Sequence, residues 1–167
     1  MKHYRCILAL AALTFGSKAI AAVPQTMERA SQRTLVIIKP DAMEQRLAGL
    51  ILARLEGEGL SPVAAKMVQL DESTLRKHYA HLVGKPFFGD IVSYMTSTPV
   101  MVLAVEGDDA VAHVREMIGP TDSSIAPKGT IRGDFGSDKS RNVIHASEDA
   151  AAADAEIAFF FNSSEIF

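Results

Sequence analysis

Four short segments with strand-like patterns constrain the fold of this chain most strongly. Residues 34–38 (Thr-Leu-Val-Ile-Ile) form a β-branched run that is typical of a buried strand. Residues 62–70 alternate loosely between apolar and polar positions, and residues 100–105 form an apolar run directly after Pro99. Residues 142–145 form a short fourth segment. We therefore predict four strands, and the segments between them determine how these strands connect.

The connecting segments carry apolar residues at helical spacing. One helix is expected after residues 39–41, because an apolar stripe follows until Gly57 and Gly59 end it. A pair of helices is predicted over residues 72–82, with Asp71 as the N-cap, and over residues 87–95. The stripe of the first helix consists of Leu47, Leu50, Ile51 and Leu55.

Two further helices are expected later in the chain. The last one follows Ser147, which is placed to cap it, with Glu148 and Asp149 at its positive end. Residues 119–141 lack any periodic pattern, and an irregular stretch of this length inside a compact domain is usually functional. The helix before that stretch begins near Gly107, and its stripe consists of Ala110, Val111, Val114 and Ile118.

The order of these elements indicates the fold class. Without the helical pair over residues 72–95, the chain reads strand, helix, strand, strand, helix, strand, followed by a last helix. This order predicts an α+β fold, an α/β sandwich of the ferredoxin-like βαββαβ type. We expect a four-stranded antiparallel sheet with helices packed on one face.

Length, charge and cysteine content exclude several classes of function. The chain has 167 residues, enough for one domain with a substantial core. The formal net charge is −3, which argues against a dedicated nucleic-acid partner, since such proteins usually carry a basic surface. The single cysteine, Cys6, excludes an intramolecular disulfide and a cysteine-based metal cluster. Neither the P-loop signature nor the protein-kinase motifs occur.

A histidine at the end of the fourth strand is the leading candidate for chemistry. His145 lies between a short strand and a capped helix, so its backbone should be held stiffly. A histidine can act as a nucleophile that divides a phosphoryl transfer into two steps. For a histidine taken alone, a structural role with a hydrogen bond to a carbonyl is the more common one.

Three cations could surround such a nucleophile. Arg132 lies between Gly129 and Gly133, which allow the backbone to approach a ligand, and its planar guanidinium suits phosphate oxygens. Arg115 lies off the apolar stripe of its helix, and Lys39 follows a buried strand. Taken singly, each has an ordinary alternative: a surface ion pair, a solvated helix face, or a strand-end charge.

Four blocks of sequence, taken together, resemble the nucleoside diphosphate kinase family. Residues 142–147 (Asn-Val-Ile-His-Ala-Ser) are similar to its active-site signature N-x-x-H-G-S-D. Residues 39–41 (Lys-Pro-Asp), 85–88 (Lys-Pro-Phe-Phe) and 129–134 (Gly-Thr-Ile-Arg-Gly-Asp) are similar to K-P-D/N, R/K-P-F-F and G-T-I-R-x-D. The resemblance runs from Arg33 to Phe161 and implies a ferredoxin-like fold.

The resemblance implies a catalytic group centred on His145. This residue would attack the γ-phosphate and become a phosphohistidine, in a ping-pong exchange between nucleotides. Glu156 would hydrogen-bond the other ring nitrogen and fix the tautomer. Ser147 would approach both residues in addition to capping. Tyr79 would pack near the phosphates and support His145.

The resemblance also implies a nucleotide site. Lys39, Arg132 and Asn142 would surround the transferring phosphate and the sugar hydroxyls, and Arg115 and Thr121 would hold the β-phosphate side. The base would stack on Phe87, with Ile91 completing the clamp. Stacking does not depend on the hydrogen-bonding groups of the base. Nucleoside di- and triphosphates with purine or pyrimidine bases should therefore both bind.

The implied cofactor is Mg²⁺, bound to the nucleotide phosphates, because the sequence shows no dedicated carboxylate cluster. His78 and His113 have no assigned role and are expected at the surface. The family forms tetramers or hexamers, and the short segment after the last helix favours a tetramer. Two alternatives remain: a non-catalytic homologue acting in nucleotide binding or assembly, and a protein phosphotransferase.

Three departures from the family pattern affect expectations. Ala146 replaces the usual glycine and adds a methyl group beside the nucleophile; if this position needs a positive φ, the cost is about 1 kcal/mol. Glu148 replaces the usual aspartate, and residues 122–124 (Asp-Ser-Ser) replace Asn-Pro-Ala. These changes bear on turnover and subunit packing rather than on the reaction class.

The segment before the domain supports two hypotheses. Lys2 and Arg5 precede an apolar stretch, which is the pattern of a secretory signal peptide and is too short for a membrane span. Either the chain is exported, or synthesis begins at Met27 and residues 1–30 are a miscalled extension. The pattern alone favours export, whereas the need for nucleoside triphosphates favours the cytoplasm. The domain itself is expected over residues 31–167.

Overall fold

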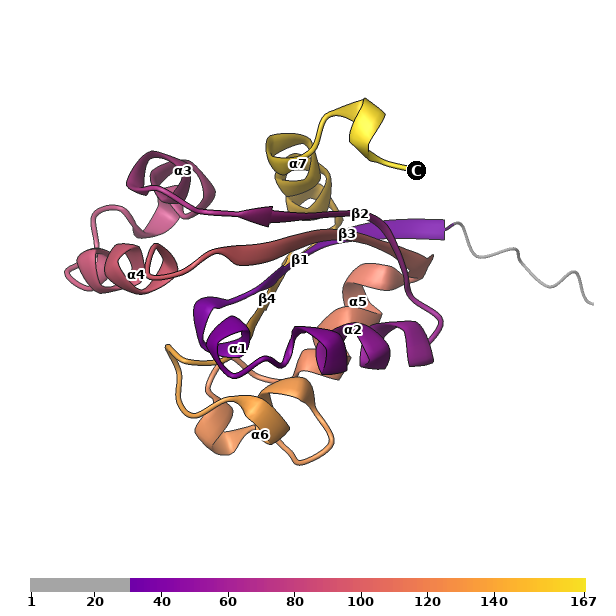
Figure 1. Ribbon diagram of the computed structural model, residues 1–167, viewed down its shortest axis with the longest axis horizontal. Coiled ribbons are helices and arrows are strands. Elements are labelled where there is room, and N and C mark those ends of the chain that lie inside the picture. The colour runs from indigo at the N-terminus through magenta and orange to yellow at the C-terminus, as the bar shows by residue number, and fades with distance from the viewer. Residues whose placement is uncertain (1–30) are drawn as a thin grey trace, which may run out of the picture.

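The computed structural model describes residues 31–167, so the signal-like extension lies outside the described residues. Four strands form one antiparallel sheet in the order β2-β3-β1-β4, as the sequence predicted (Figure 1). Their bounds are Ser31–Ile38 for β1, Ser61–Val68 for β2, Val100–Asp108 for β3 and Ile144–Ala146 for β4. This is the strand order of a ferredoxin-like fold, and it makes β2 and β4 the edge strands.

The helices follow the predicted order with local differences. Their bounds are Pro40–Glu44 for α1, Ala48–Gly57 for α2, Glu72–His78 for α3, Phe88–Met95 for α4, Ala110–Ile118 for α5, Ile131–Phe135 for α6 and Ala150–Phe160 for α7. Short 3₁₀ turns occupy Ala80–Leu82, Ser123–Ile125 and Ser163–Glu165. Within residues 31–167, no helix combines the length and the apolar character needed to cross a bilayer.

Several boundaries differ from prediction. The first expected helix is split into α1 and α2 by Arg46, whose φ of 60° ends the first piece. Leu50 does not belong to the buried stripe, because its side chain is 56% exposed on α2. β3 continues to Asp108 before α5 begins, and α6 forms inside the stretch that was expected to be irregular.

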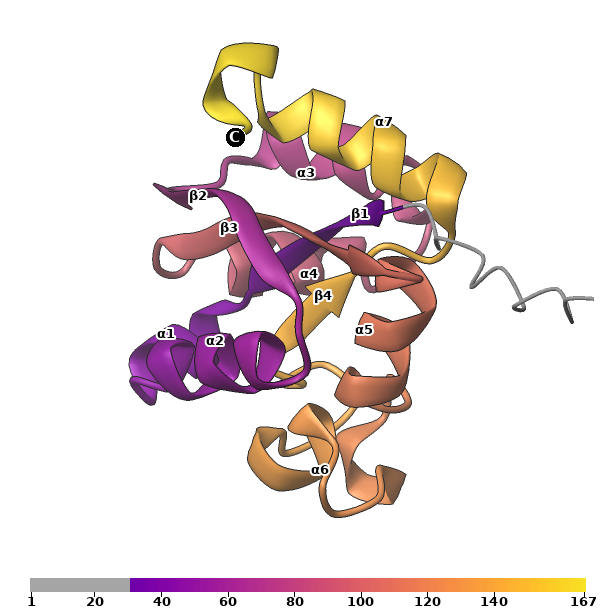
Figure 2. The same cartoon turned by 90° about the vertical axis from the view of Figure 1, so that its right-hand side faces the viewer.

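Helices cover both faces of the sheet, although we expected them on one. Helices α2 and α5 lie on one face, and α7 and α3 lie on the other (Figures 1 and 2). The cause is β1, whose four residues from Leu35 to Ile38 are all 0% exposed. Because successive strand side chains point to opposite faces, both faces of β1 need an apolar cover.

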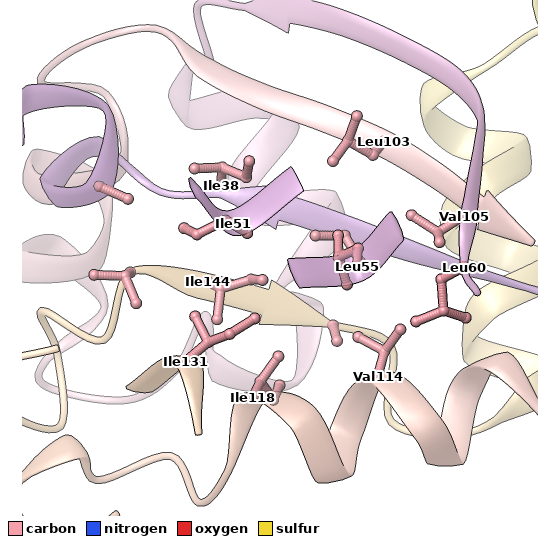
Figure 3. Close-up of a cluster of buried hydrophobic side chains, with 14 of the residues drawn as sticks. Ile38, Ile51, Leu55, Leu60, Leu103, Val105, Val114, Ile118, Ile131 and Ile144 are labelled. Carbon is pink, nitrogen blue, oxygen red and sulfur yellow. The ribbon is translucent and has the colours of Figure 1, made fainter. Parts of the chain in front are cut away.

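Two hydrophobic clusters result, one on each face. Val36 and Ile38 of β1 pack with the residues of α2 and α5 that Figure 3 shows, among them Ile51, Leu55 and Val114. Leu35 and Ile37 belong to the second cluster, together with residues of α3, α4 and α7 (Leu75, Met95 and Ile157). The sheet therefore separates two cores.

The register of β4 decides where the candidate nucleophile points. His145 is the cross-strand partner of Ile37, so its side chain lies on the α3 and α7 face. Ala146 pairs with Val36 and faces the opposite core. Its extra methyl group therefore lies away from the histidine ring, and Ala146 is not among the described residues with a positive φ. The methyl group therefore does not crowd the ring, and the condition for backbone strain at this position is not met.

The caps of two helices were also predicted. Asp71 accepts a hydrogen bond from the Thr74 amide at 2.7 Å and caps α3 as expected. The cap of α7 is Asp149, which accepts from the Ala152 amide at 2.8 Å, and not Ser147. Ser147 instead lies two positions before that cap with a fully buried side chain. It is therefore free for another role.

Candidate active site

His145, Glu156 and Ser147 form a hydrogen-bonded group between β4 and α7. The Nε2 atom of His145 lies 3.2 and 3.3 Å from the two carboxylate oxygens of Glu156. The hydroxyl of Ser147 donates to one of these oxygens at 2.7 Å and accepts from the Leu35 amide at 3.2 Å. Ser147 thereby fixes the carboxylate relative to β1, which explains why this polar residue is 0% exposed.

The carboxylate of Glu156 is kept ionised by this group. Burial by itself raises its pKa, but the hydrogen bonds from His145 and Ser147 outweigh burial, and the net shift is downward. An ionised Glu156 accepts a proton-bearing Nε2, so the lone pair of the ring lies on Nδ1. Among the described residues, Nδ1 of His145 has no hydrogen-bond partner, and the side chain is 19% exposed. The geometry leaves one ring nitrogen open to a ligand.

His78 is buried beside this group, and its predicted surface position is wrong. Its side chain is 2% exposed, and its ring lies 4.8 Å from that of His145 and 4.4 Å from that of Tyr79 in edge-on contacts. The residue ends α3, whose side facing α7 carries it inward, and Phe160 of α7 adds an edge-on contact at 5.6 Å. Burial, together with electrostatic repulsion between the protonated forms of His78 and the adjacent His145, lowers the His78 pKa to about 4. His78 is therefore neutral at physiological pH.

Two more of the expected residues lie close to this group. The ring of Tyr79 is 6.1 Å from that of His145, and burial raises the pKa of its hydroxyl, so the phenol stays protonated. His113, in contrast, lies at the surface of α5 as expected, with its Nε2 atom 3.7 Å from Glu58.

Lys39 and Asn142 meet on the other side of the strand ends. The Lys39 ammonium donates to the Asn142 side-chain oxygen at 2.6 Å, and the Asn142 amide nitrogen donates to the Thr121 carbonyl at 2.8 Å. Burial, and to a lesser extent the charge of Arg132, lower the Lys39 pKa to about 8, although Asp41 opposes the shift. Lys39 is thus a weakly solvated cation that gains from an anionic ligand.

Arg132 lies in α6 with its guanidinium almost buried. It donates to the Gly119 carbonyl at 2.8 Å and to the Ile144 carbonyl, next to His145, at 3.0 Å. The Nε atom of Arg132 is buried without a hydrogen-bond partner. Burial is the main cause that lowers the pKa of the guanidinium to about 10, and the charge of Arg115 is the second. Arg115 itself is exposed on α5. The structure thus brings three cations into electrostatic contact.

The turn that leads into β4 is held in an unusual backbone conformation. Val143 has φ 60°, which is a rare conformation for a β-branched residue, and it is fully buried. Its amide donates to the Asp41 carboxylate at 3.1 Å, and its carbonyl accepts from the Lys39 amide at 2.9 Å. The hydroxyl of Tyr94 also donates to Asp41. Asp41 therefore anchors the turn between Asn142 and His145.

A cleft of about 490 Å³ opens beside this turn. It contains six of the predicted site residues, which are Lys39, Tyr79, Phe87, Ile91, Thr121 and Asn142. His145, Glu156, Ser147, Arg132 and Arg115 are not part of its lining. His145 nevertheless adjoins the cleft through Tyr79, which lines it.

The outer wall of the cleft is aromatic. Phe87 is 49% exposed, whereas the adjacent Phe88 is 5% exposed and packs inward. Phe87, Ile91 and Tyr94 follow one another at spacings of four and three residues, so they share one face of α4. A flat apolar ligand can enter between this face and the polar residues around Lys39.

Sequence reasoning missed several residues of this region. His78 was read as a surface residue, Asp41 and Tyr94 had no assigned role, and Lys139 and Ser140 line the cleft. The helical spacing of Tyr94 from Phe87 is a signal that could have identified it. His78 gave no such signal, because its neighbours in α3 are mostly exposed and charged.

Potential metal ligands occur at two places near the site, one at a single carboxylate and one at a three-residue cluster. Asp90 is the one carboxylate among the cleft residues, and it is exposed. Among residues 31–167, one cluster of potential metal ligands of the His, Cys, Asp and Glu types is found, formed by His78, His145 and Glu156. The cleft therefore offers Mg²⁺ no cage of oxygen ligands.

Comparison with known proteins identifies relatives over most of this chain. The family model described as nucleoside diphosphate kinase matches residues 32–166. A nucleoside diphosphate kinase of Methanobrevibacter smithii is 45% identical over 135 residues, which are 81% of this chain and 90% of that relative. One of Saccharolobus solfataricus is 47% identical over 136 residues, which are 81% of this chain and 99% of that relative.

Solved structures give the same result. The nucleoside diphosphate kinase of Aquifex aeolicus superimposes with a TM-score of 0.78 at 43% identity and covers 83% of this chain and 100% of its own. The enzyme of that name from Halobacterium salinarum, solved in complex with CDP, gives a TM-score of 0.80 at 45% identity, with 82% of this chain and 91% of that chain covered. The likeness therefore extends to sequence as well as fold.

Proposed function

The chain belongs to the nucleoside diphosphate kinase family, and on that premise we propose that His145 carries the transferred phosphate as a phosphohistidine. The chain is an enzyme of this type. One observation carries the assignment of His145: Glu156 occupies Nε2, and Nδ1 is left without a partner beside the cleft. The nucleophile is thereby an uncharged ring nitrogen.

The reaction has two half-reactions. The Nδ1 lone pair attacks the γ-phosphorus in line, an N–P bond forms, the bond from γ-phosphorus to the bridging oxygen breaks, and the nucleoside diphosphate leaves with that electron pair. A second diphosphate then attacks the phosphohistidine and reverses these steps. Glu156 holds the Nε2 proton throughout and stabilises the positive charge that develops on the ring, while Ser147 keeps the carboxylate in position.

Three basic side chains accompany the phosphate. Lys39 and Arg132 neutralise the charge on the phosphoryl oxygens, and Arg115 holds the β-phosphate side together with Thr121. The lowered pKa values of Lys39 and Arg132 support this assignment, because both cations are poorly solvated and gain from an anion. Positioning and charge neutralisation are the main sources of catalysis in phosphoryl transfer.

The outer wall of the cleft binds the nucleoside. Phe87 stacks on the base and Ile91 completes the clamp, while Asn142 and Lys39 contact the sugar hydroxyls. This part of the proposal rests on the exposed ring of Phe87 at the cleft. Because every base presents an aromatic face, the site accepts purine and pyrimidine nucleotides alike.

Mg²⁺ is the proposed cofactor, carried by the nucleotide. The cleft lining fits this role because it contains the single carboxylate of Asp90 and no group of oxygen ligands that would hold the ion alone. When bound, the ion neutralises charge on the phosphate oxygens. The residues of the chain bind the complex and align it with Nδ1 of His145.

Labelling separates this function from its alternatives. The protein is incubated with γ-labelled ATP and then with GDP. Acid-labile label that GDP removes as labelled GTP supports the proposal, label that only a protein removes indicates a protein phosphotransferase, and absence of label indicates a non-catalytic homologue. The variant His145→Ala should lose labelling and at least about a thousandfold of the exchange rate. His113→Ala, on the surface of α5, is the control and should keep both.

Self-association is proposed as well, as a tetramer rather than a hexamer. Two exposed apolar side chains support an interface: Leu50 on α2 is 56% exposed, and Met67 on the edge strand β2 is 53% exposed. Light scattering on a size-exclusion column measures the assembly mass. A monomeric mass would reject this proposal.

The compartment follows from the substrates. We propose that residues 31–167 form the catalytic domain and that it works in the cytoplasm, where nucleoside triphosphates are available. Sequencing the N-terminus of the native protein tests this, since a start at Met27 supports it. A start within the residues that follow the apolar stretch would indicate a cleaved leader and export.

A further inference from the structure

We propose that His78, His145 and Glu156 form a binding site for a transition-metal ion such as Zn²⁺, which inhibits phosphate transfer when it is occupied. The site lies between α3, β4 and α7, beside the cleft rather than within its lining. It is distinct from the Mg²⁺ that accompanies the nucleotide. The binding itself depends on geometry alone, whereas the inhibition rests on the proposed role of His145.

The distances fit a metal ion with little movement. One atom from each residue can be chosen so that all three lie within 4.8 Å of one another. The Nε2 atom of His145 is 3.2 Å from Glu156, and the Nδ1 atom of His78 is 3.8 Å from its other oxygen. Ligand atoms around a tetrahedral zinc ion are about 3.3 Å apart, given bonds of about 2.0–2.1 Å. A small inward shift of the His78 ring completes the site.

The ligand chemistry selects the metal. Two imidazoles and one carboxylate are a set that zinc uses at sites with an open fourth position, where water binds. Mg²⁺ prefers oxygen ligands and keeps its waters, so it should not compete here. The hydroxyl of Ser147 donates to Glu156 at 2.7 Å and orients the carboxylate, as outer hydrogen bonds do at metal sites.

An independent observation at His78 points to a ligand. The Nε2 atom of this ring is buried and has no hydrogen-bond partner among the described residues, and its Nδ1 atom is too far from Glu156 for a hydrogen bond. Burial of the unpartnered Nε2 costs free energy, so no hydrogen bond of that nitrogen explains why the ring lies here. Nδ1 faces Glu156 at 3.8 Å and is available to a ligand. The ring is otherwise enclosed by Tyr79 and Phe160.

The ion would inhibit phosphate transfer by binding Nε2 of His145, which stays protonated in the proposed mechanism. Zn²⁺ at Nε2 of His145 displaces the proton and takes Glu156 as a ligand. The bound cation withdraws electron density from the ring, so the Nδ1 lone pair becomes a weaker nucleophile. Since none of the three ligands lines the cleft, nucleotide binding should persist while phosphorylation slows.

The first test measures binding of zinc alone to the full chain without nucleotide. His3 and Cys6 are potential ligands outside the described residues, so the parent carries His3→Gln and Cys6→Ser. Calorimetry should show one Zn²⁺ per chain at this site and no binding of Mg²⁺. His78→Phe, which keeps a flat ring among the aromatic neighbours, should weaken zinc binding by at least about tenfold through loss of one ligand.

A matched control and a second variant complete this test. His81 is exposed three residues away, so His81→Asn removes a nearby imidazole and should leave zinc affinity unchanged. His78→Gln is measured in parallel in case the phenyl ring disturbs the fold. At the same zinc concentration, the melting temperature should rise less in either His78 variant than in the parent. Equal zinc affinity in the parent and the folded His78 variants would overturn the proposal.

The second test separates inhibition from the proposed function. Zinc should slow labelling of His145 by γ-labelled ATP in the parent, while nucleotide affinity, measured directly by calorimetry, stays the same. His78→Phe should need at least about tenfold more zinc for the same slowing. Zinc binding that leaves the labelling rate unchanged would overturn the inhibitory role. Absence of labelling in the zinc-free parent would instead reject the phosphohistidine, and the binding test would still decide the metal site.

Discussion

The hydroxyl of Tyr94 donates a hydrogen bond of 2.6 Å to the carboxylate of Asp41, which lies 53 residues earlier in the chain. Burial and this hydrogen bond raise the pKa of Tyr94, so the phenol remains a donor across the accessible pH range. Asp41 in turn accepts from the amide of Val143, whose backbone is strained. The contact therefore links α4 to the turn that positions His145.

Removing that hydroxyl should destabilise the fold. Tyr94→Phe keeps the ring in the cleft wall but leaves the carboxylate of Asp41 without one of its donors, and we expect a loss of about 1–3 kcal/mol in the free energy of unfolding. Urea titration followed by circular dichroism measures it. Ser93→Ala, at an exposed neighbouring position, should change the free energy by less than about 0.5 kcal/mol. Equal midpoints for both variants would contradict the anchoring role of Asp41.

The charge of Glu156 should matter more for turnover than for binding. Glu156→Gln keeps the side-chain shape but removes the negative charge that, on the proposed mechanism, stabilises the cation developing on His145. We expect the rate constant of turnover to fall about ten- to a hundredfold, or about 1.4–2.7 kcal/mol in the barrier, with nucleotide affinity retained. Steady-state kinetics and calorimetry measure the two quantities. Glu148→Gln makes the same charge change at an exposed site and should leave both unaltered.

Activity should decline at alkaline pH because of Lys39. Its pKa is lowered to about 8, so the side chain is a cation below this pH and neutral above it. The ratio kcat/KM reports the free enzyme and should fall as pH rises through about 8, while kcat holds to higher pH, because bound phosphate favours the charged amine. The profile is measured in a Cys6→Ser background to exclude the thiol. A Lys39→Met variant that retained the same alkaline decline would assign it to another group.

The exposed ring of Phe87 should contribute equally to all nucleotides. Phe87→Ala removes the proposed stacking partner of the base, and we expect binding to weaken by about 1–3 kcal/mol for adenine, guanine and cytosine nucleotides alike. Affinities for the three diphosphates measure it. Phe159→Ala, another exposed aromatic position, should have no effect on binding. Weakening confined to one base would show that the ring sets specificity instead.

The fold and much of the site could be predicted because local patterns and motifs agreed. The four strands and the stripe of α5 follow from apolar periodicity, and all four residues of that stripe are buried. Two of the four sequence blocks come from distant segments, yet Lys39 of one donates a hydrogen bond to Asn142 of the other. Asn142 in turn donates to the carbonyl of Thr121. The positions of these blocks at the ends of predicted strands indicated that they would lie together, because the order of strands in the sheet determines which strand ends are neighbours.

The remaining features depend on packing that sequence patterns do not encode. Ser147 looked like a cap because it is a small hydroxyl residue before a helix, but Asp149 caps α7. Ser147 keeps only the contact with Glu156 that the family resemblance implied. Leu50 matched the helical stripe, yet α2 presents it outward. His78 is buried only because α7 packs over the end of α3, which is a tertiary contact. Local patterns did not determine these positions, because tertiary packing decides which side chains are buried.

The bonds that join β1 and the following turn to the β4 region have a consequence for synthesis of the protein. Leu35, Lys39 and Asp41 bond to Ser147, Asn142 and Val143, across 112, 103 and 102 residues. A nascent chain released from the ribosome as far as β3 would hold the first members of these pairs and none of their partners. On the proposed mechanism, the capacity to carry phosphate should therefore appear only late in translation, once β4 has emerged. A truncated product that ends before β4 should have no phosphotransfer activity.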